Sequence, residues 1–300
     1  MPDSHSDPQN QSVRPIDLRS RAEAAIGALP ALVLSAERLA SMIAPGAHGL
    51  RRAGPGEDFW QFRPAHAGDT ARSIDWRRSA RSDAAFVRDR EAQSAQAVSI
   101  WVSAGRGMNH AGAPGRPTKA DRAHLLAVAL SVLLLRGGEK VALWGDPPRA
   151  GRAQAERIAE QLLSAPPAAD DADAPDFAPL RTGRRLVLIG DFLGDPGPHL
   201  ALIGQAAAQG LRGAALQVLD PDEESFPFAG AVLFRSISGA VRHDTRAAEG
   251  LRDEYLAALA ARRAALRDGC AGAGWQFGHH VTDQPPAQAL LWLSQALGRA

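Results

Sequence analysis

The stretch AVSIWVSAGRGMNHAGAPGRPTKADRAHLLAVALSVLLLRGGEKVALW, residues 97–144, contains the pattern that predicts the fold. AVSIWV at 97–102 is a short apolar run rich in β-forming residues, which is typical of a buried strand. Thr118 and Asp121 have the spacing of a capping box, so we expect a long apolar helix that a glycine pair then ends. VALW at 141–144 predicts the next strand.

The same alternation continues toward the end of the chain. We expect strands at 186–190, 214–219 and 275–277 and a hairpin from 231–236 and 240–242. We expect helices at 153–163, 198–210 and 286–297, and a further long helix that Asp244 caps. Strands alternating with helices of this length predict a mostly parallel, doubly wound α/β sheet covered on both faces. Ligands collect in such folds at the carboxyl ends of the strands, near the point where strand order reverses. The loops to inspect therefore follow Val102, Trp144, Gly190 and Leu219.

The region before this alternation divides into two parts. Residues 1–15 are polar and Pro-containing, and we expect a disordered tail. Residues 16–42 have apolar residues at helical spacing around Pro30, which predicts a helix pair or one kinked helix. Residues 46–96 have weak periodicity, so we expect an irregular or short-stranded module. The predicted division is a tail at 1–15, an N-terminal module at 16–95 that packs against the rest, and an α/β domain at 96–300.

Composition excludes several classes of protein. The chain has 300 residues, 45% of them hydrophobic and 22% charged, with a formal net charge of +1, so neither global disorder nor a strongly basic nucleic-acid binder is expected. Cys270 is the single cysteine, which fits a reducing compartment. No signal peptide and no apolar run long enough for a membrane span is present. We therefore expect a cytoplasmic protein without a membrane span.

Residues 57–91 contain the densest charge pattern, in which arginines and aspartates alternate around Trp60 and Trp76. Three interpretations remain open: internal ion pairs that brace a loop-rich module, a surface that docks a partner, and a nucleic-acid patch. Guanidinium–carboxylate pairs are geometrically specific and suit the first two. Nucleic acid is the least favoured, because a patch for phosphates is expected to carry fewer interleaved acids.

The motifs of common catalytic sites are not found in the sequence. G-x-S-x-G does not occur, Cys270 has no obvious basic setting, and His279 and His280 would point to opposite faces of a strand. We therefore predict no catalytic residue, no metal ligand set and no cofactor.

The segment GDTARSIDWRRSAR at 68–81, preceded by EDFWQFRPAHAGD, resembles the signature of the domain-of-unknown-function 58 family. The matching positions are Arg63, Gly68, Asp69, Arg72, Ile74, Asp75, Trp76, Ser79, Ala80 and Arg81. LDPDEESFPFAG at 219–230, LIGDF at 188–192 and VTDQP at 281–285 are similar to later segments of the family, so the resemblance covers roughly residues 20–297. Arg63, Asp69, Arg72, Asp75, Trp76, Ser79 and Arg81 are the candidate partner-binding or structural residues of the signature.

The resemblance implies a von Willebrand factor A-like α/β domain behind the N-terminal module. It also implies that the protein works as an adaptor with a MoxR-type AAA+ ATPase, and with that ATPase's client, in assembly, maturation or stress responses. Many relatives have N-terminal membrane helices, and this chain resembles the soluble branch.

Domains of this fold often hold a metal-ion-dependent adhesion site, with D-x-S-x-S after the first strand and an aspartate after a later one. Here Ser103 stands at the aspartate position, Gly105 and Gly107 stand at the serine positions, and Asp191 matches the later aspartate. One carboxylate does not hold Mg²⁺. The resemblance therefore implies a degenerate adhesion site.

The loop that begins at Asp220 also carries two aromatic residues, Phe226 and Phe228. They either dock a partner or tuck into the core to hold a long connection, and the sequence leaves both open. The function expected is a non-enzymatic adaptor for the ATPase, and the alternative is an arginine-rich nucleic-acid-binding protein.

Overall fold

The computed structural model describes residues 15–43, 51–53, 59–65, 74–79, 85–93, 96–166, 168, 174–175, 184–235 and 242–299. Of the predicted tail at 1–15, only Pro15 lies inside this set, as the first residue of helix α1 (Pro15–Ser41).

Five parallel strands form the central sheet in the order β10-β7-β6-β4-β5. They are β4 (Ala97–Val102), β5 (Lys140–Leu143), β6 (Arg184–Gly190), β7 (Arg212–Leu219) and β10 (Gln276–Val281). A parallel sheet buried on both faces needs continuous apolar runs rather than alternation. LVLI at 186–189 in β6 is such a run, and each of its four side chains is fully buried.

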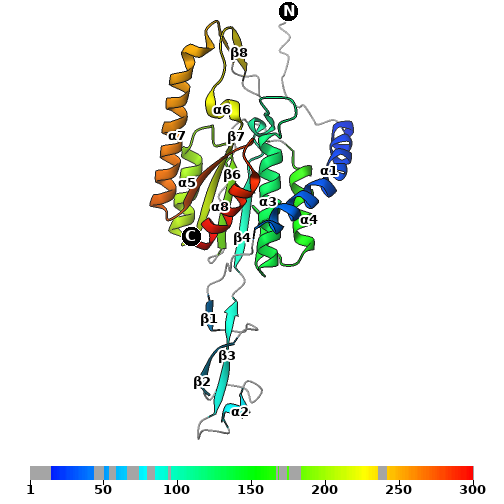
Figure 1. The fold of residues 1–300 in the computed structure, drawn as a ribbon, viewed down its shortest axis with the longest axis vertical. Coiled ribbons are helices and arrows are strands. Elements are labelled where there is room, and N and C mark those ends of the chain that lie inside the picture. The colour runs from blue at the N-terminus through cyan, green and yellow to red at the C-terminus, as the bar shows by residue number, and fades with distance from the viewer. Residues whose placement is uncertain are drawn as a thin grey trace, which may run out of the picture.

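Helices cover both faces of this sheet (Figure 1). Helices α1, α3 (Lys119–Arg136), α4 (Ala153–Ser164) and α8 (Pro286–Arg299) share one core with Val187 and Ile189. Helices α5 (Gly197–Ala208) and α7 (Arg252–Gly272) share the other with Leu186 and Leu188. Successive residues of a strand point to opposite faces, so one short run supplies both cores. The predicted α/β fold class, a doubly wound and mostly parallel sheet covered on both faces, is confirmed.

The strand order reverses between β4 and β6. From β4 the chain crosses to β5 on one side, and the following strand, β6, lies on the other side of β4. The carboxyl ends of β4 and β6 are therefore neighbours, and the Ser103 N–H donates to the Ile189 carbonyl at 2.8 Å. This is the position in the topology at which ligands of open α/β sheets collect.

Helix α1 is one continuous helix with Pro30 inside it, the kinked-helix alternative of the two predicted. Ala36 and Ala40 are buried against the core that α3 and α4 share. This part of the N-terminal module packs on the α/β domain, as expected.

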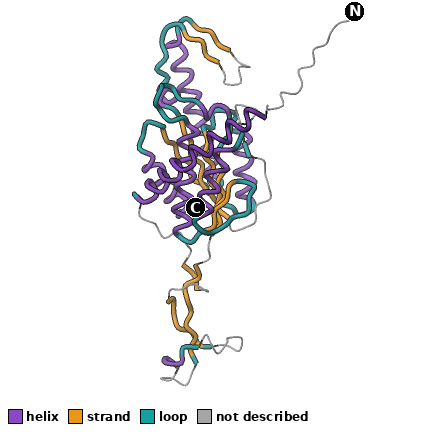
Figure 2. The backbone as a smooth tube through the Cα atoms, turned by 90° about the vertical axis from the view of Figure 1, so that its right-hand side faces the viewer, coloured by secondary structure: helices purple, strands orange, loops and turns teal. Residues whose placement is uncertain are grey.

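The rest of the N-terminal module is an arm that projects from the body (Figures 1 and 2). It comprises β1 (Arg51–Ala53), β2 (Phe59–Pro64), α2 (Trp76–Ser79) and β3 (Phe86–Gln93), with the antiparallel order β1-β3-β2. The short-stranded character is as predicted, whereas the expectation that this part packs against the α/β domain is wrong. Gln93 ends β3 only four positions before Ala97 begins β4, which leaves little chain for the strands to fold back on the body.

The prediction for Asp244 is also wrong. Asp244 lies in β9 (Arg242–Thr245), opposite Leu233 of β8 (Val232–Arg235), in an antiparallel pair that confirms the hairpin but begins its second strand later than expected. Helix α7 begins at Arg252 after the 3-10 turn η3 (Ala248–Leu251). Asp244 has the side chain of a good cap, but pairing with the preceding strand of the same hairpin took precedence over that preference.

Candidate functional site

The loops at the carboxyl ends of β4, β6 and β7 meet at the point where strand order reverses, and we call residues 103–112, 191–193 and 220–225 the switch-point edge. Ser103 and Asp191 are both buried there, at 6% and 8% exposure. A Cβ on Gly107 would lie 2.9 Å from the Asp191 Oδ2 atom, so a side chain at this position would displace the carboxylate. The structure therefore brings together the predicted residues of the two loops.

Lys119, the first residue of α3, lies at the centre of this edge. Its side chain is fully buried, and its Nζ donates to Asp191 Oδ2 at 2.8 Å and to Glu223 Oε1 at 2.6 Å. Burial by itself lowers the pKa of Lys119, but the charges of Asp191 and Glu223 outweigh it and raise that pKa above its ordinary value. The ammonium is therefore a permanent positive charge inside the edge.

Local sequence explains why Lys119 points here. Thr118 caps α3, since its hydroxyl accepts from the Asp121 N–H while Asp121 accepts from the Thr118 N–H. This capping box, which the sequence predicted, fixes the first turn of the helix and with it the origin of the Lys119 side chain. Sequence reasoning missed the residue, and the available signal was its rarity, because only two of the 34 Lys and Arg residues are lysines.

Asp220, which the sequence placed in a possible docking loop, is fully buried. Its carboxylate accepts from the Gly112 N–H at 3.0 Å, from Arg116 at 3.2 Å and from the Asp222 N–H at 2.9 Å. It is also the N-cap of the short helix α6 (Pro221–Ser225), with Glu223 completing a capping box. One motif, D-P-x-E, thus ties α6 to the first loop through Asp220 and to Lys119 through Glu223.

Of the two arrangements left open for the aromatic residues, the structure has the tucked one for Phe226. This residue is 6% exposed, and its ring centroid lies 4.8 Å from that of Tyr255 and 5.1 Å from that of Phe228. Phe228 is half-buried beside Phe234, at 5.3 Å. The Tyr255 hydroxyl donates to the Glu223 carbonyl at 2.7 Å, so the aromatic cluster braces α6 from behind.

A second chain of polar contacts supports Asp191. Gln217 donates to the Asp191 carbonyl at 2.8 Å, and Arg263 donates to Gln217 at 2.7 Å and to Glu224 at 2.8 Å. The hydrogen bond from Arg263 lowers the pKa of Glu224. Buried polar groups that satisfy one another in this way hold a single geometry.

The residues of this edge do not fit a divalent cation. Mg²⁺ takes six oxygen ligands in near-octahedral geometry. The first loop offers no carboxylate, since Ser103, Gly105 and Gly107 stand at the ligand positions, and the Lys119 ammonium is already 2.8 Å from the Asp191 carboxylate. Within the described part of the chain, no group of three or more His, Cys, Asp and Glu side chains is placed to hold a metal ion.

The described residues of the signature segment lie in the arm, at the other end of the molecule from the switch-point edge (Figure 1). The Ser79 hydroxyl donates to the Asp75 carbonyl at 2.8 Å and accepts from the Phe86 N–H at 2.8 Å, which fastens α2 to β3. Trp76 is 64% exposed on α2. Arg63 lies in β2 opposite Val87. Asp69, Arg72 and Arg81 lie outside the described residues.

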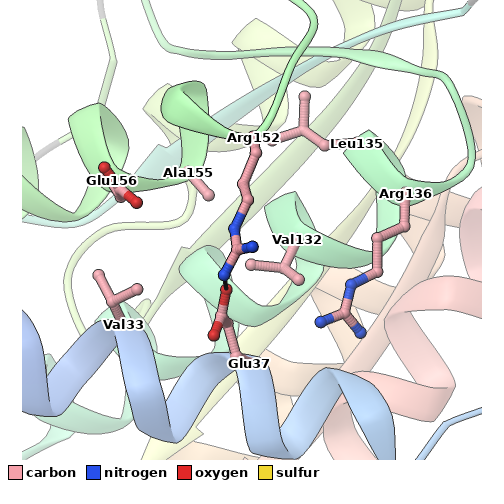
Figure 3. Close-up of a pocket in the computed structure, with 8 residues that line it drawn as sticks. All are labelled: Val33, Glu37, Val132, Leu135, Arg136, Arg152, Ala155 and Glu156. Carbon is pink, nitrogen blue, oxygen red and sulfur yellow. Dashed lines mark hydrogen bonds and ion pairs between the residues drawn. The ribbon is translucent and has the colours of Figure 1, made fainter.

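A cavity of about 330 Å³ lies between α1, α3 and α4 (Figure 3). Val33, Val132 and Ala155 line it with apolar surface, and Glu37 and Arg152 form an ion pair of 2.7 Å across it. The α3 residues in its wall belong to the last turns of the helix, whereas Lys119 is the first residue. This cavity is therefore separate from the switch-point edge.

Cys270 and His280, both buried in the α/β domain, are poor candidates for catalysis. Burial raises the pKa of Cys270 to about 12, so this thiol is not a thiolate near neutral pH. Burial, with the nearby Arg122 charge, lowers the pKa of His280 to about 4, which keeps the ring neutral. His280 contacts Arg122 at 3.1 Å inside the fold rather than facing a cleft.

None of the described helices combines the length and apolar composition that crossing a membrane requires. Among solved structures, the chain is similar to an aerotolerance-related membrane protein from Bacteroides fragilis, with 17% identity, 68% of this chain and 100% of that chain covered, and a TM-score of 0.42. It is also similar to the conserved hypothetical protein BatB from Bacteroides thetaiotaomicron, with 16% identity, the same coverage and a TM-score of 0.40.

Among curated proteins, the chain is 28% identical over 266 residues to the uncharacterized protein Rv1480 of Mycobacterium tuberculosis and to the uncharacterized protein Mb1516 of Mycobacterium bovis. These matches cover 82% of this chain and 81% of each relative. The family described as "Protein of unknown function DUF58" matches residues 61–265, which is more than half of the chain. The match spans most of the arm and of the α/β domain, and the chain belongs to this family.

Proposed function

We propose that this protein is a non-enzymatic adaptor that works with a MoxR-type AAA+ ATPase in protein assembly, maturation or stress response, and that it contacts its partner through the end of the arm. The class of partner comes from the family resemblance. The proposed docking site rests on the exposure of Trp76, whose side chain is 64% exposed on helix α2, which the arm holds away from the body (Figure 1).

The local structure around Trp76 suits a binding anchor. The Asp75 N–H donates to the Phe86 carbonyl, and the Ser79 hydroxyl accepts from the Phe86 N–H, so α2 is fastened to β3 and presents the indole from a fixed turn. Arg77 beside it is also exposed. Tryptophan and arginine are the residues most enriched among those that dominate binding energy at protein interfaces. A rigidly held anchor also loses little conformational entropy when it binds.

The proposal extends to the switch-point edge and to the compartment. We propose that this edge is a degenerate adhesion site, so the partner contact does not depend on a divalent metal. The absence of any internal disulfide in a chain with one cysteine supports a cytoplasmic location.

The test is a pull-down from the native cell with tagged wild-type, Trp76→Ala and Met42→Ala proteins, washed at moderate salt with and without a chelator. Met42 is the matched control, because it is an apolar side chain, 73% exposed, in the turn that directly follows α1 on the body. We expect an AAA+ ATPase with wild type and Met42→Ala in both washes, and its loss with Trp76→Ala. With purified ATPase, Trp76→Ala should raise Kd about 30-fold, the size expected for loss of one dominant anchor.

Three outcomes contradict parts of this proposal. Equal ATPase binding by folded Trp76→Ala would remove the arm as the docking site. Recovery of the ATPase only when metal is present would show that the edge does use a cation. Nuclease-sensitive recovery of many proteins without an ATPase would favour the nucleic-acid alternative, whose affinity should fall steeply with salt.

A further inference from the structure

Two carboxylates from separate loops converge on one positive charge at the switch-point edge. Asp191 follows β6, and Glu223 lies in α6 after β7, yet both contact the Lys119 Nζ, at 2.8 and 2.6 Å. The Lys119 side chain is 1% exposed, so water does not share this contact to any large extent. The geometry is that of a small cation site in which the cation is attached to the chain.

The surrounding residues match an ammonium group and not a metal ion. An ammonium group has three N–H donors, and the two carboxylate contacts use two of them. Mg²⁺ would need six oxygens, yet the first loop contributes glycines at two of the expected ligand positions, Gly105 and Gly107. Gly107 also leaves space for the Asp191 carboxylate, because a Cβ at this position would lie 2.9 Å from the Asp191 Oδ2 atom.

We propose that the Lys119 ammonium is a tethered cation that permanently occupies the cation position of the switch-point edge. It does there what a bound metal would do structurally, since it holds the loop after β6 and helix α6 together by charge. Unlike a metal, it offers no open coordination position to a partner's carboxylate and does not dissociate. The edge is therefore always closed, and its stability does not respond to divalent metal.

This inference does not depend on the adaptor role, because it concerns only the α/β domain. Its first test is thermal unfolding of four proteins with Mg²⁺ or Mn²⁺ alone as the probe. The proteins are wild type, Lys119→Ala, Lys119→Ala/Asp191→Asn and Lys140→Ala. Lys140 is the matched control because it is the other lysine and lies exposed at the start of β5.

Lys119→Ala should melt at a lower temperature than wild type, because Asp191 and Glu223 then lie in the edge without their cation. The double variant should recover part of this loss, since it removes one of the two carboxylate charges, and Lys140→Ala should melt with wild type. Neither ion should raise the melting temperature of wild type, because the edge lacks the oxygen ligands that a divalent cation needs. A rise in the wild-type melting temperature with either ion, or a Lys119→Ala protein as stable as wild type, would overturn the proposal.

The second test uses the wild-type protein alone, so it does not depend on whether a variant folds. Because the chain has two lysines, ¹⁵N-labelled protein gives two lysine ammonium environments that NMR can separate. The Lys119 signal should exchange slowly with water and stay unchanged when Mg²⁺ is added, whereas the exposed Lys140 exchanges fast. A saturable shift or loss of the Lys119 signal with Mg²⁺ would show that the metal displaces the ammonium and would refute the proposal.

Discussion

Replacing the buried Asp220 with alanine should loosen the switch-point edge. The carboxylate is fully buried and serves three donors at once: the Gly112 and Asp222 N–H groups and Arg116. Alanine leaves the partly buried Gly112 N–H without its acceptor and removes the cap of α6.

The magnitude follows from these two losses. An N-cap contributes about 1 kcal/mol. A hydrogen bond from a partly buried N–H to a charged group contributes about 1.5–3 kcal/mol. The two are coupled through one side chain, so we expect Asp220→Ala to lower the free energy of unfolding by about 3 kcal/mol. For a domain of this size the melting temperature should fall by about 6–12 °C.

The assay is thermal unfolding followed by circular dichroism, with Arg116→Ala as the matched control. Arg116 contacts the same carboxylate, but its side chain is 35% exposed and the pair is partly screened by water. Arg116→Ala should therefore shift the melting temperature much less than Asp220→Ala. Equal shifts for the two variants would refute the reasoning, because the hydrogen bonds from the Gly112 and Asp222 N–H groups would then contribute nothing beyond the pair with Arg116.

Two further predictions concern stability at other places in the fold. Burial raises the pKa of Glu139 from 4.5 to about 7, opposed by the Gln96 N–H, so the folded state binds this proton more tightly than the unfolded state. Stability should therefore fall as pH rises from about 4.5 to 7, by up to about 3 kcal/mol, and denaturant titrations of Glu139→Gln should lack this fall. Gly107→Ala should lower the melting temperature because its Cβ meets Asp191, whereas Gly204→Ala, in α5 with nothing within 4 Å, should raise stability by about 0.5–1 kcal/mol. A stabilised Gly107→Ala, or an unchanged pH profile in Glu139→Gln, would contradict these placements.

The elements that local patterns specify were predictable. The apolar runs of β4, β6 and β7 and the capping box of α3 depend on residues within a few positions of one another, and the structure has them where expected. The Asp220 motif was also recognised, although its contacts were not. Asp244 shows the limit of this approach, because a hairpin strand and a helix cap are both local options for this residue and the sequence pattern does not decide between them.

The sequence by itself determined the class of fold, the positions of the strands and the loops that face the switch-point edge, because periodicity and capping are local properties of the chain. Only the tertiary structure decided that Lys119 is the centre of that edge. Its two carboxylate partners lie 72 and 104 residues away along the chain, and burial of a charge depends on all the groups that surround it.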